Sequence, residues 1–371
     1  MKRWLRRILR LALAGAALLF ATIAVEIAMG WPCHLQGQIS QPIPQPQARK
    51  TITSTIPGYA RSEDDTYLSY PEWYIVWSYQ EKADFQQNHL PSGFPYFHAV
   101  PQYWGSYFCI SRLVHGKYPM NFGEQIMLVV IGTSFSAEYI LKGAYEETVG
   151  RLSEWTSGGH PVDEDTDAYR VAREYADFVH TRPFYEFRFA HHIRGLWTQT
   201  PLFGPHWIRK WERKTFLTMD YTVEAFYCWL IEQATHATYG YEPADTHAWI
   251  ANADAGMFQR ATEVKQLKDL GGGSFIVDIP RYQKFTSVAS NLTNRGAQFV
   301  DIAGNSQIIV SVLAPVQWRY QGSNGRQLFS SPILTRPGSE RVVIDCNVES
   351  LGRLVGDLHA GGATIEHVYD Y

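Results

Sequence analysis

The sequence predicts a multidomain α+β protein, in which an N-terminal transmembrane helix precedes an all-α, aromatic-rich domain and a C-terminal ferredoxin-like α/β sandwich. Three observations support this prediction. A basic tip leads into one long apolar run, helical periodicity then continues as far as Leu270, and the order strand, helix, strand occurs twice after Gly271–Gly273. The expected parts are residues 1–31 (cytoplasmic tip and anchor), 32–65 (linker), 66–271 (helical domain) and 273–371 (ferredoxin-like domain).

The composition is that of a folded chain with no general affinity for nucleic acid. Of the 371 residues, 45% are hydrophobic and 19% are charged, and the net charge is −3, so neither disorder nor a polyanionic partner is indicated. Aromatic residues reach 14%. Such rings are favoured in cores, in binding surfaces and at the membrane interface, and composition alone does not choose among these places.

The four cysteines give no sign of metal or redox chemistry. Cys33, Cys109, Cys228 and Cys346 are scattered without CxxC spacing, so we expect no metal and no cofactor. Each is expected to behave as a small buried hydrophobe. An oxidising compartment would allow a disulfide, but Cys33 lies just beyond the apolar run and is not expected to meet a cysteine of the core.

The N-terminal segment has the pattern of a signal anchor. Five basic residues come first: Lys2, Arg3, Arg6, Arg7 and Arg10. The apolar run from Leu11 to Met29 is interrupted only by Glu26, and a helix needs about 20 residues to cross a bilayer. No further Lys or Arg occurs before Arg49, so the positive-inside rule predicts a cytoplasmic N-terminus and a periplasmic body at a bacterial inner membrane.

A cleaved signal peptide is the competing interpretation, because such peptides also join a basic region to an apolar run. Ala28-Met29-Gly30 would be a tolerable cleavage site. The apolar run is longer than the usual signal-peptide core of about 7 to 15 residues, which favours an uncleaved anchor. Both interpretations place the body in the same compartment.

Residues 32–65 are predicted to be a flexible linker. The segment is rich in Gln, Pro, Ser and Thr and includes three prolines between Gln41 and Pro46, which favours extended polyproline geometry over packing. It would hold the helical domain away from the bilayer or run along the protein surface.

The helical domain is predicted to begin at Ser69, an N-cap with Glu72 closing a capping box. Further helical patterns follow at Phe97–His115, Phe122–Trp155, Asp165–His180, Pro183–Trp197, Pro205–Tyr239 and Asp245–Leu270. The apolar stretch Ile126–Ile131 lies between Glu124 and Glu138 and is too short for a second membrane crossing. We therefore expect it to belong to a central buried helix.

The C-terminal residues are predicted to form a ferredoxin-like sandwich from two βαβ units. The units are Ser274–Pro280, Tyr282–Asn294 and Gln298–Ile302, then Arg341–Asn347, Glu349–His359 and Thr364–Tyr369. A strand at Gln307–Ala314 and a hairpin or edge-strand insertion at Tyr320–Ser339 are expected between them. This element order resembles that of ACT-like and other ferredoxin-like modules, without any shared motif, and similarity of fold does not carry function.

Four polar residues of the helical domain are the candidates for catalysis: Glu138, Asp220, Glu224 and His236. Asp220 and Glu224 are one helical turn apart, as are Glu232 and His236, and such spacing can direct acid–base groups to one side. The simpler interpretation of these pairs is a solvated or ion-paired helix face. A carboxylate at Glu138 in an apolar helix needs a partner. Arginines that could supply it are Arg112, Arg194 and Arg213.

Other polar motifs do not indicate a cofactor site. His191-His192 lie on an aromatic helix without a cysteine or a further histidine at ligand spacing. Gly271–Gly273 precedes a strand and does not join a strand to a helix, so it is not a phosphate loop.

The segment Arg194–Lys214 is the predicted membrane or partner surface. Aromatic and basic residues interleave there: Trp197, Phe203, Trp207 and Trp211 with Arg194, Arg209, Lys210, Arg213 and Lys214. Such a mixture suits the headgroup layer of a membrane. The alternative is that the tryptophans pack inward while the basic residues form the wet face of the helix.

Three functional hypotheses follow. The leading one is a non-enzymatic single-pass membrane protein whose extracytoplasmic body binds a partner protein, lipid or hydrophobic ligand in a scaffold or assembly role. Its expected partners are membrane lipids and a membrane or periplasmic protein, and not nucleic acid. The alternative is a membrane-associated enzyme that acts on a lipid or envelope substrate through Glu138, Asp220, Glu224 and His236. A second alternative is small-ligand sensing by the ferredoxin-like domain.

Overall fold

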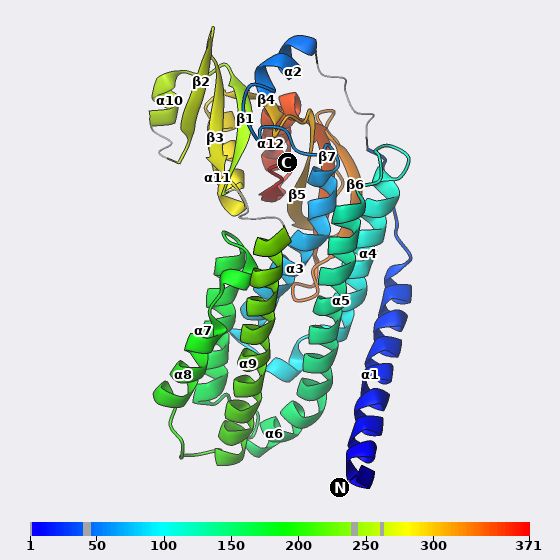
Figure 1. Cartoon of the computed structure of the whole chain (residues 1–371). Helices are drawn as coiled ribbons and strands as arrows, with labels where there is room; N and C mark the ends of the chain where they lie inside the picture. Colours follow the sequence, from blue (N-terminus) through cyan, green and yellow to red (C-terminus); the bar gives the residue numbers. More distant parts are fainter. Residues whose placement is uncertain (1, 40–45, 239–243, 260–262) are drawn as a thin grey trace.

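The structure, a computed structural model, describes residues 2–39, 46–238, 244–259 and 263–371. It is an α+β protein in which a helical region is followed by two four-stranded antiparallel sheets. Figure 1 shows the long helices running side by side, with both sheets gathered beyond one end of them. The predicted α+β class is confirmed.

Most predicted helices between Phe97 and Tyr239 are present with shifted ends. The helices of this region are α1 (Lys2–Gly30), α2 (Gln47–Thr53), α3 (Asp65–Gln86), α4 (Tyr96–Val114), α5 (Phe122–Tyr145), α6 (Arg151–Thr156), α7 (Asp163–Val179), α8 (Phe189–Gln199) and α9 (Trp207–Thr238). A π-helical turn, Glu146–Gly150, joins α5 to α6. Helix α3 begins at Asp65 and not at the predicted N-cap Ser69, whose Oγ donates a hydrogen bond to the Thr66 carbonyl at 3.2 Å.

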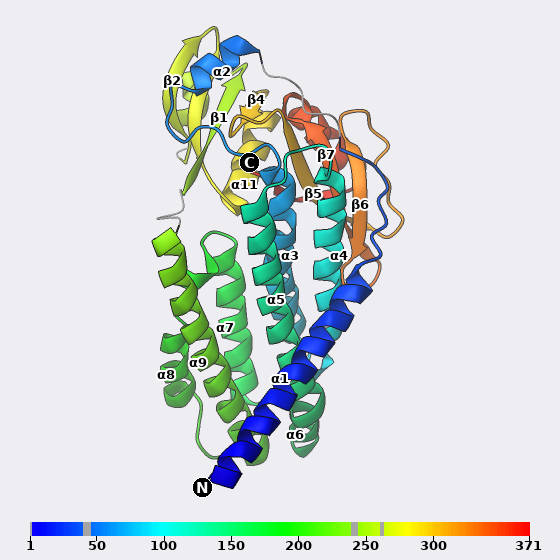
Figure 2. The same ribbon diagram turned by 45° about the vertical axis from the view of Figure 1, so that its right-hand side comes forward.

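Helix α1 packs against α4 and α5, and its C-terminal end is fixed to α4 (Figure 2). A Cβ atom at Gly30 would lie 2.6 Å from the Trp104 Cβ, so glycine permits this close helix crossing. Just beyond it, Cys33 and Cys109 form a disulfide with Cα atoms 5.3 Å apart. The prediction that Cys33 would not pair is therefore wrong, because the chain leaving α1 turns back onto α4.

The described parts of the linker lie against the sheet region. The backbone N–H groups of Gln36 and Gly37 donate hydrogen bonds to the Leu328 carbonyl at 2.7 and 3.2 Å. After the linker residues 40–45, which lie outside the described residues, α2 places Arg49 Nη2 3.2 Å from Glu349 Oε1. Of the two courses expected for the linker, these contacts correspond to the one along the protein surface.

Helix α5 is not the centrally buried helix that was expected. Its side chains Phe122, Ile126, Val129 and Val130 are exposed. The Glu138 side chain faces neighbouring helices, because it accepts a hydrogen bond from Tyr79 of α3 at 2.6 Å. Among the described residues, two helical stretches are long and apolar enough to cross a membrane: Leu13–Gly30 and Phe122–Thr156.

The C-terminal region consists of two sheets with the same strand order. In the first, β1 (Asp245–Ala251), β2 (Lys265–Gly271), β3 (Ser274–Pro280) and β4 (Gln298–Ile302) lie in the order β2-β3-β1-β4. In the second, β5 (Gln307–Pro315), β6 (Arg326–Pro332), β7 (Ser339–Asn347) and β8 (Thr364–Val368) lie in the order β6-β7-β5-β8. Helix α11 (Gln283–Asn294) links β3 to β4, and α12 (Leu351–Ala360) links β7 to β8.

Two predictions for this region are wrong in detail. The segment Asp245–Leu270, predicted as a helix, contains β1, the short helix α10 (Ala255–Gln259) and β2. Burial along β1 alternates, which is the period of a strand with one face in a core. The two predicted βαβ units also lie in different sheets and do not share one. Gly271–Gly273, all with positive φ, turn β2 back onto β3.

Helix α3 joins the helical region to the second sheet. Its Tyr67 Oη donates a hydrogen bond to Asp345 Oδ1 of β7 at 2.8 Å, and the Arg341 guanidinium lies 4.1 Å from the centre of the Trp77 ring. A hydrophobic core extends from α3, α4 and α5 into both sheets, and a second core cluster joins α7, α8 and α9. Many of the aromatic side chains are therefore buried in these two cores.

Candidate functional site

A cluster of charged side chains inside the helical region is the candidate site. Its central residue is Lys142 of α5. The Lys142 Nζ lies 2.8 Å from Glu138 Oε1, 3.0 Å from Asp220 Oδ1 and 3.0 Å from Glu224 Oε1, and all four side chains are 12–16% exposed. Three of the four predicted catalytic residues therefore meet at one point. The side chain of the fourth, His236, lies outside the described part of the structure.

Lys142 was not among the expected partners of Glu138. The predicted arginines are engaged elsewhere or exposed: Arg112 with the carbonyls of residues 31 and 33, Arg213 with Glu146, and Arg194 at the surface. The sequence signal for Lys142 is its place four residues after Glu138, which is the spacing of ion pairs on one helix. Tyr79 Oη of α3 also donates a hydrogen bond to Glu138 Oε2 at 2.6 Å.

A cavity of about 60 Å³ lies beside this cluster, lined by residues of α3, α5, α7 and α9. Gln86 Oε1, Glu146 Oε2 and Tyr221 Oη of its lining have no hydrogen-bond partner among the described residues. Buried polar atoms without a protein partner usually bond to internal water. The volume suits a few water molecules and is far too small for a lipid or a peptide.

The first turns of α9 place four basic side chains inside the protein, where each is paired. The shortest contacts with carboxylates are Arg209 to Asp165 at 2.8 Å, Lys210 to Asp163 at 2.6 Å, Arg213 to Glu146 at 2.7 Å and Lys214 to Glu164 at 3.1 Å. All four basic residues are buried. A buried charge is tolerated only when it is paired and hydrogen-bonded, and α7 with the turn before α6 supplies the carboxylates.

The opposite side of α9 is apolar and exposed. Its exposed residues, at helical spacing, are Trp207, Ile208, Trp211, Met219, Val223, Phe226, Trp229 and Leu230. Trp207 is 62% exposed and Phe226 is 61% exposed. We call these residues, together with Phe122, Ile126, Val129 and Val130 of the neighbouring α5, the α5–α9 apolar surface.

The residues of the predicted surface Arg194–Lys214 do not all face outward, and the role of this surface stays a prediction. Phe203, Trp207 and Trp211 are exposed, as are Arg194 and Trp197 of α8, but the other basic residues of the predicted set point inward. The alternative of inward tryptophans and outward basic residues is also wrong for α9. Both interpretations assumed that charges face water, whereas the carboxylates of α7 provide partners inside the protein.

The remaining polar candidates form ordinary pairs. Glu232 accepts hydrogen bonds from Arg188 at 3.2 Å. The His192 Nε2 lies 3.8 Å from Glu174, and its ring stacks on Phe187. Within the described ranges, no group of three or more His, Cys, Asp or Glu side chains is arranged to hold a metal ion.

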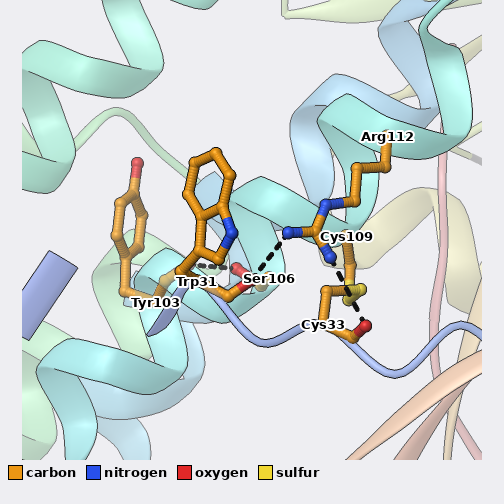
Figure 3. The surroundings of a disulfide bond; sticks show 6 residues. All are labelled: Trp31, Cys33, Tyr103, Ser106, Cys109 and Arg112. Atoms are coloured by element: carbon orange, nitrogen blue, oxygen red, sulfur yellow. Dashed lines mark hydrogen bonds between the residues drawn. A yellow bond between two sulfur atoms is a disulfide. The ribbon is translucent and has the colours of Figure 1, made fainter. Parts of the chain in front are cut away.

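The surroundings of the disulfide fix the chain where it leaves α1 (Figure 3). Arg112 Nη2 donates a hydrogen bond to the Trp31 carbonyl at 2.8 Å, and its guanidinium lies 5.3 Å from the Trp31 ring centre. With Cys33 bonded to Cys109, three contacts therefore hold this short segment on α4. Disulfides persist in oxidising compartments. This disulfide and the apolar N-terminal helix, whether that helix is a signal or an anchor, therefore indicate an extracytoplasmic protein.

Comparison with known proteins identifies no relative of this chain. Protein-family models, curated proteins and solved structures were all compared with this chain, and none of them matches. Function therefore has to be inferred from the geometry of the molecule itself.

Proposed function

We propose that this chain is a non-enzymatic protein held in a bacterial inner membrane by α1, with its body on the periplasmic side, and that it works through apolar contact at the α5–α9 apolar surface. This role is one of binding or assembly. The observation that carries the proposal is the distribution of residues on α9, where charged side chains point inward and large apolar side chains point outward. Extended exposed apolar surfaces mark sites of contact with protein, ligand or membrane.

The chemistry of the charged cluster supports binding over catalysis. Glu138, Asp220 and Glu224 already share the Lys142 ammonium group. The adjoining cavity of about 60 Å³ leaves no room for an envelope or lipid substrate beside them. A general acid or base must reach the atom that it protonates or deprotonates, and these carboxylates are directed at Lys142.

The packing of α1 supports an anchor over a cleaved signal peptide. Gly30, within the candidate cleavage site, lies in the close crossing with Trp104 of α4. Ile23 and Glu26, a turn or two earlier, are buried in the same contact. Removal of residues before this point would uncover the α4 surface that they cover.

The sheet region is proposed to serve assembly or regulation. Each four-stranded sheet, with its strand order 2-3-1-4 and the helix between its third and fourth strands, corresponds to a ferredoxin-like module. On this interpretation the chain carries two such modules in tandem, where the sequence suggested one. Small-ligand sensing by these modules remains the weaker alternative.

Affinity purification of the full chain from native membranes tests the proposal. Phe226→Glu, which places a charge on the α5–α9 apolar surface, should reduce the lipid or protein that co-purifies with the chain. Asp177→Lys is the matched control, because Asp177 on the polar side of α7 is 70% exposed. Equal recovery with Phe226→Glu and with the unmodified chain would contradict a binding role for this surface.

An enzyme that acts on an envelope substrate is the second candidate function. The convergence of Glu138, Asp220 and Glu224 on one point favours it. The variant Glu224→Gln distinguishes binding from catalysis, because the amide keeps the shape of the side chain but cannot accept a proton at neutral pH. If a strain lacking the chain is rescued by Glu224→Gln and not by Phe226→Glu, binding is supported. The reverse result supports catalysis.

A further inference from the structure

The α5–α9 apolar surface has the length of a membrane interior. On α9 it extends from Trp207 to Leu230, which is about 35 Å at the rise of an α-helix. On α5 it extends from Phe122 to Val130, about 12 Å by the same rise. The hydrocarbon core of a bilayer is about 30 Å thick. A binding groove for a short peptide would not need an apolar stripe of the length found on α9.

The ends of the α9 stripe carry tryptophan. Trp207 and Trp211 lie at its first turns, and Trp229 lies at its far end, all of them exposed. Tryptophan is enriched at both boundaries of a bilayer, where its ring meets the headgroups. The charged side chains of α9 face the interior of the helical region in ion pairs, and ionisable residues of membrane-embedded helices are arranged in this way.

The apolar surface is continuous with the helix that can anchor the chain. Helix α1 packs against α5 and crosses the same side of the helical region (Figure 2). It exposes Leu13, Leu18, Phe20 and Val25. The apolar side chains of α1 and α5 therefore belong to one side of the molecule.

The connectivity is compatible with a sheet region that lies outside the membrane. Helix α5 runs away from the sheets and α9 returns toward them (Figure 1). The chain therefore re-enters the sheet region on the side from which it left. If α5 alone crossed the bilayer, the C-terminal region would lie in the cytoplasm. Because α9 runs back in the opposite direction, the C-terminal region stays on the periplasmic side.

We infer that the α5–α9 apolar surface contacts the acyl chains of the bilayer that holds α1. This inference rests on the proposed function and names the partner of its apolar surface. Exposed charged side chains lie on α7 instead, at Arg170, Glu174 and Asp177, and a helix side of this kind does not suit acyl chains. Lipid contact is thus one-sided, and it orients the helical region about the axis of α1.

Photo-cross-linking of the full chain in native membranes tests this inference. A benzophenone amino acid replaces Phe226 or Val129 on the apolar surface, and Asp177 on the polar side as the control. After irradiation and purification, the mass of one phospholipid should be added at the first two positions and not at Asp177.

The other outcomes distinguish the inferred lipid contact from the proposed binding role. A protein adduct at Phe226 and Val129, without lipid, would overturn lipid contact and leave the proposed binding role intact. No adduct with lipid or protein at either position, while the apolar surface is also open to a water-soluble reagent, would overturn both. Lipid adducts of equal yield at all three positions would overturn the one-sided orientation.

Discussion

Lys142 is the residue on which the interior of the helical region most depends. Its single positive charge is shared by three carboxylates that come from α5 and α9. Removal of one partner of a buried ion pair typically costs about 3–5 kcal/mol, because the remaining charge is left without compensation. In this cluster the loss would leave Glu138, Asp220 and Glu224 facing one another.

Lys142→Met should therefore lower the free energy of unfolding by roughly 3–5 kcal/mol. Urea unfolding of the purified full chain in detergent measures the change. The matched control adds Glu138→Gln, Asp220→Asn and Glu224→Gln to Lys142→Met, and it should recover much of the loss because the repelling charges are gone. A loss below about 1 kcal/mol, the scale of an exposed ion pair, would show that the cluster is not a structural unit.

Asp301 gives the sheet region a dependence of stability on pH. Its side chain is buried on β4 and accepts a hydrogen bond from Tyr59 Oη. Burial raises the pKa of Asp301 to about 6, although the Tyr59 hydrogen bond and Arg49 act in the opposite direction. The folded chain therefore keeps a proton that the unfolded chain has already lost between about pH 4 and pH 6.

The stability contributed by Asp301 should fall as pH rises from about 4 to 6 and then stay level, a change of roughly 3 kcal/mol for a shift of this size. Asp301→Asn should abolish this dependence and raise stability at pH 7, because the amide accepts the Tyr59 hydrogen bond without a buried charge. Melting temperatures of both chains between pH 4 and pH 8 measure the effect. Parallel curves for the two chains would contradict the assignment.

At the scale of elements, the disulfide should stabilise the attachment of α1. Cys33 and Cys109 are 76 residues apart, and closing a loop of this length restricts the unfolded chain by about 4.5 kcal/mol in the chain-entropy model. Cys33→Ser should lower the melting temperature, and a reducing agent should then have no further effect on it. An unchanged melting temperature would show that α1 is held by packing alone.

Gly30 should control whether that disulfide can form. Gly30→Leu places a side chain where a Cβ alone would lie 2.6 Å from the Trp104 Cβ, so α1 must move away from α4. Gly15→Leu is the matched control, because no heavy atom lies within 4 Å of a Cβ at Gly15. Non-reducing gels should show less oxidised chain for Gly30→Leu than for Gly15→Leu, and equal fractions would contradict the close crossing.

The elements differ in how far sequence could predict them. Helices with strong apolar periodicity, such as α4 and α9, were predicted within a few residues of their ends. Asp245–Leu270 was wrongly predicted as a helix, because two short strands joined through α10 do not produce a long period-two pattern. The disulfide was missed because pairing of Cys33 depends on the chain turning back after α1, which is a property of the tertiary structure.

At the scale of the whole molecule, three carboxylates of the candidate site were named from the sequence, but its central Lys142 and its arrangement were not. The spacing of Glu138, Asp220 and Glu224 placed each on a helix, but their meeting at Lys142 depends on how α5 and α9 pack. The sequence likewise allowed the tryptophans and the basic residues of α9 to lie on different sides of the helix. It could not show which side faces inward, because the answer depends on the carboxylates of α7.

The central claim is that the outward apolar side of α9 is covered in the native membrane. Single cysteines at Val223 and at Asp177, both exposed in the isolated chain, can be treated in native membranes with a membrane-impermeant maleimide. The chain without an added cysteine provides the blank for buried Cys228 and Cys346. The account predicts that Val223→Cys is protected until detergent is added, while Asp177→Cys reacts throughout. Equal labelling of Val223→Cys and Asp177→Cys in intact membranes would contradict it.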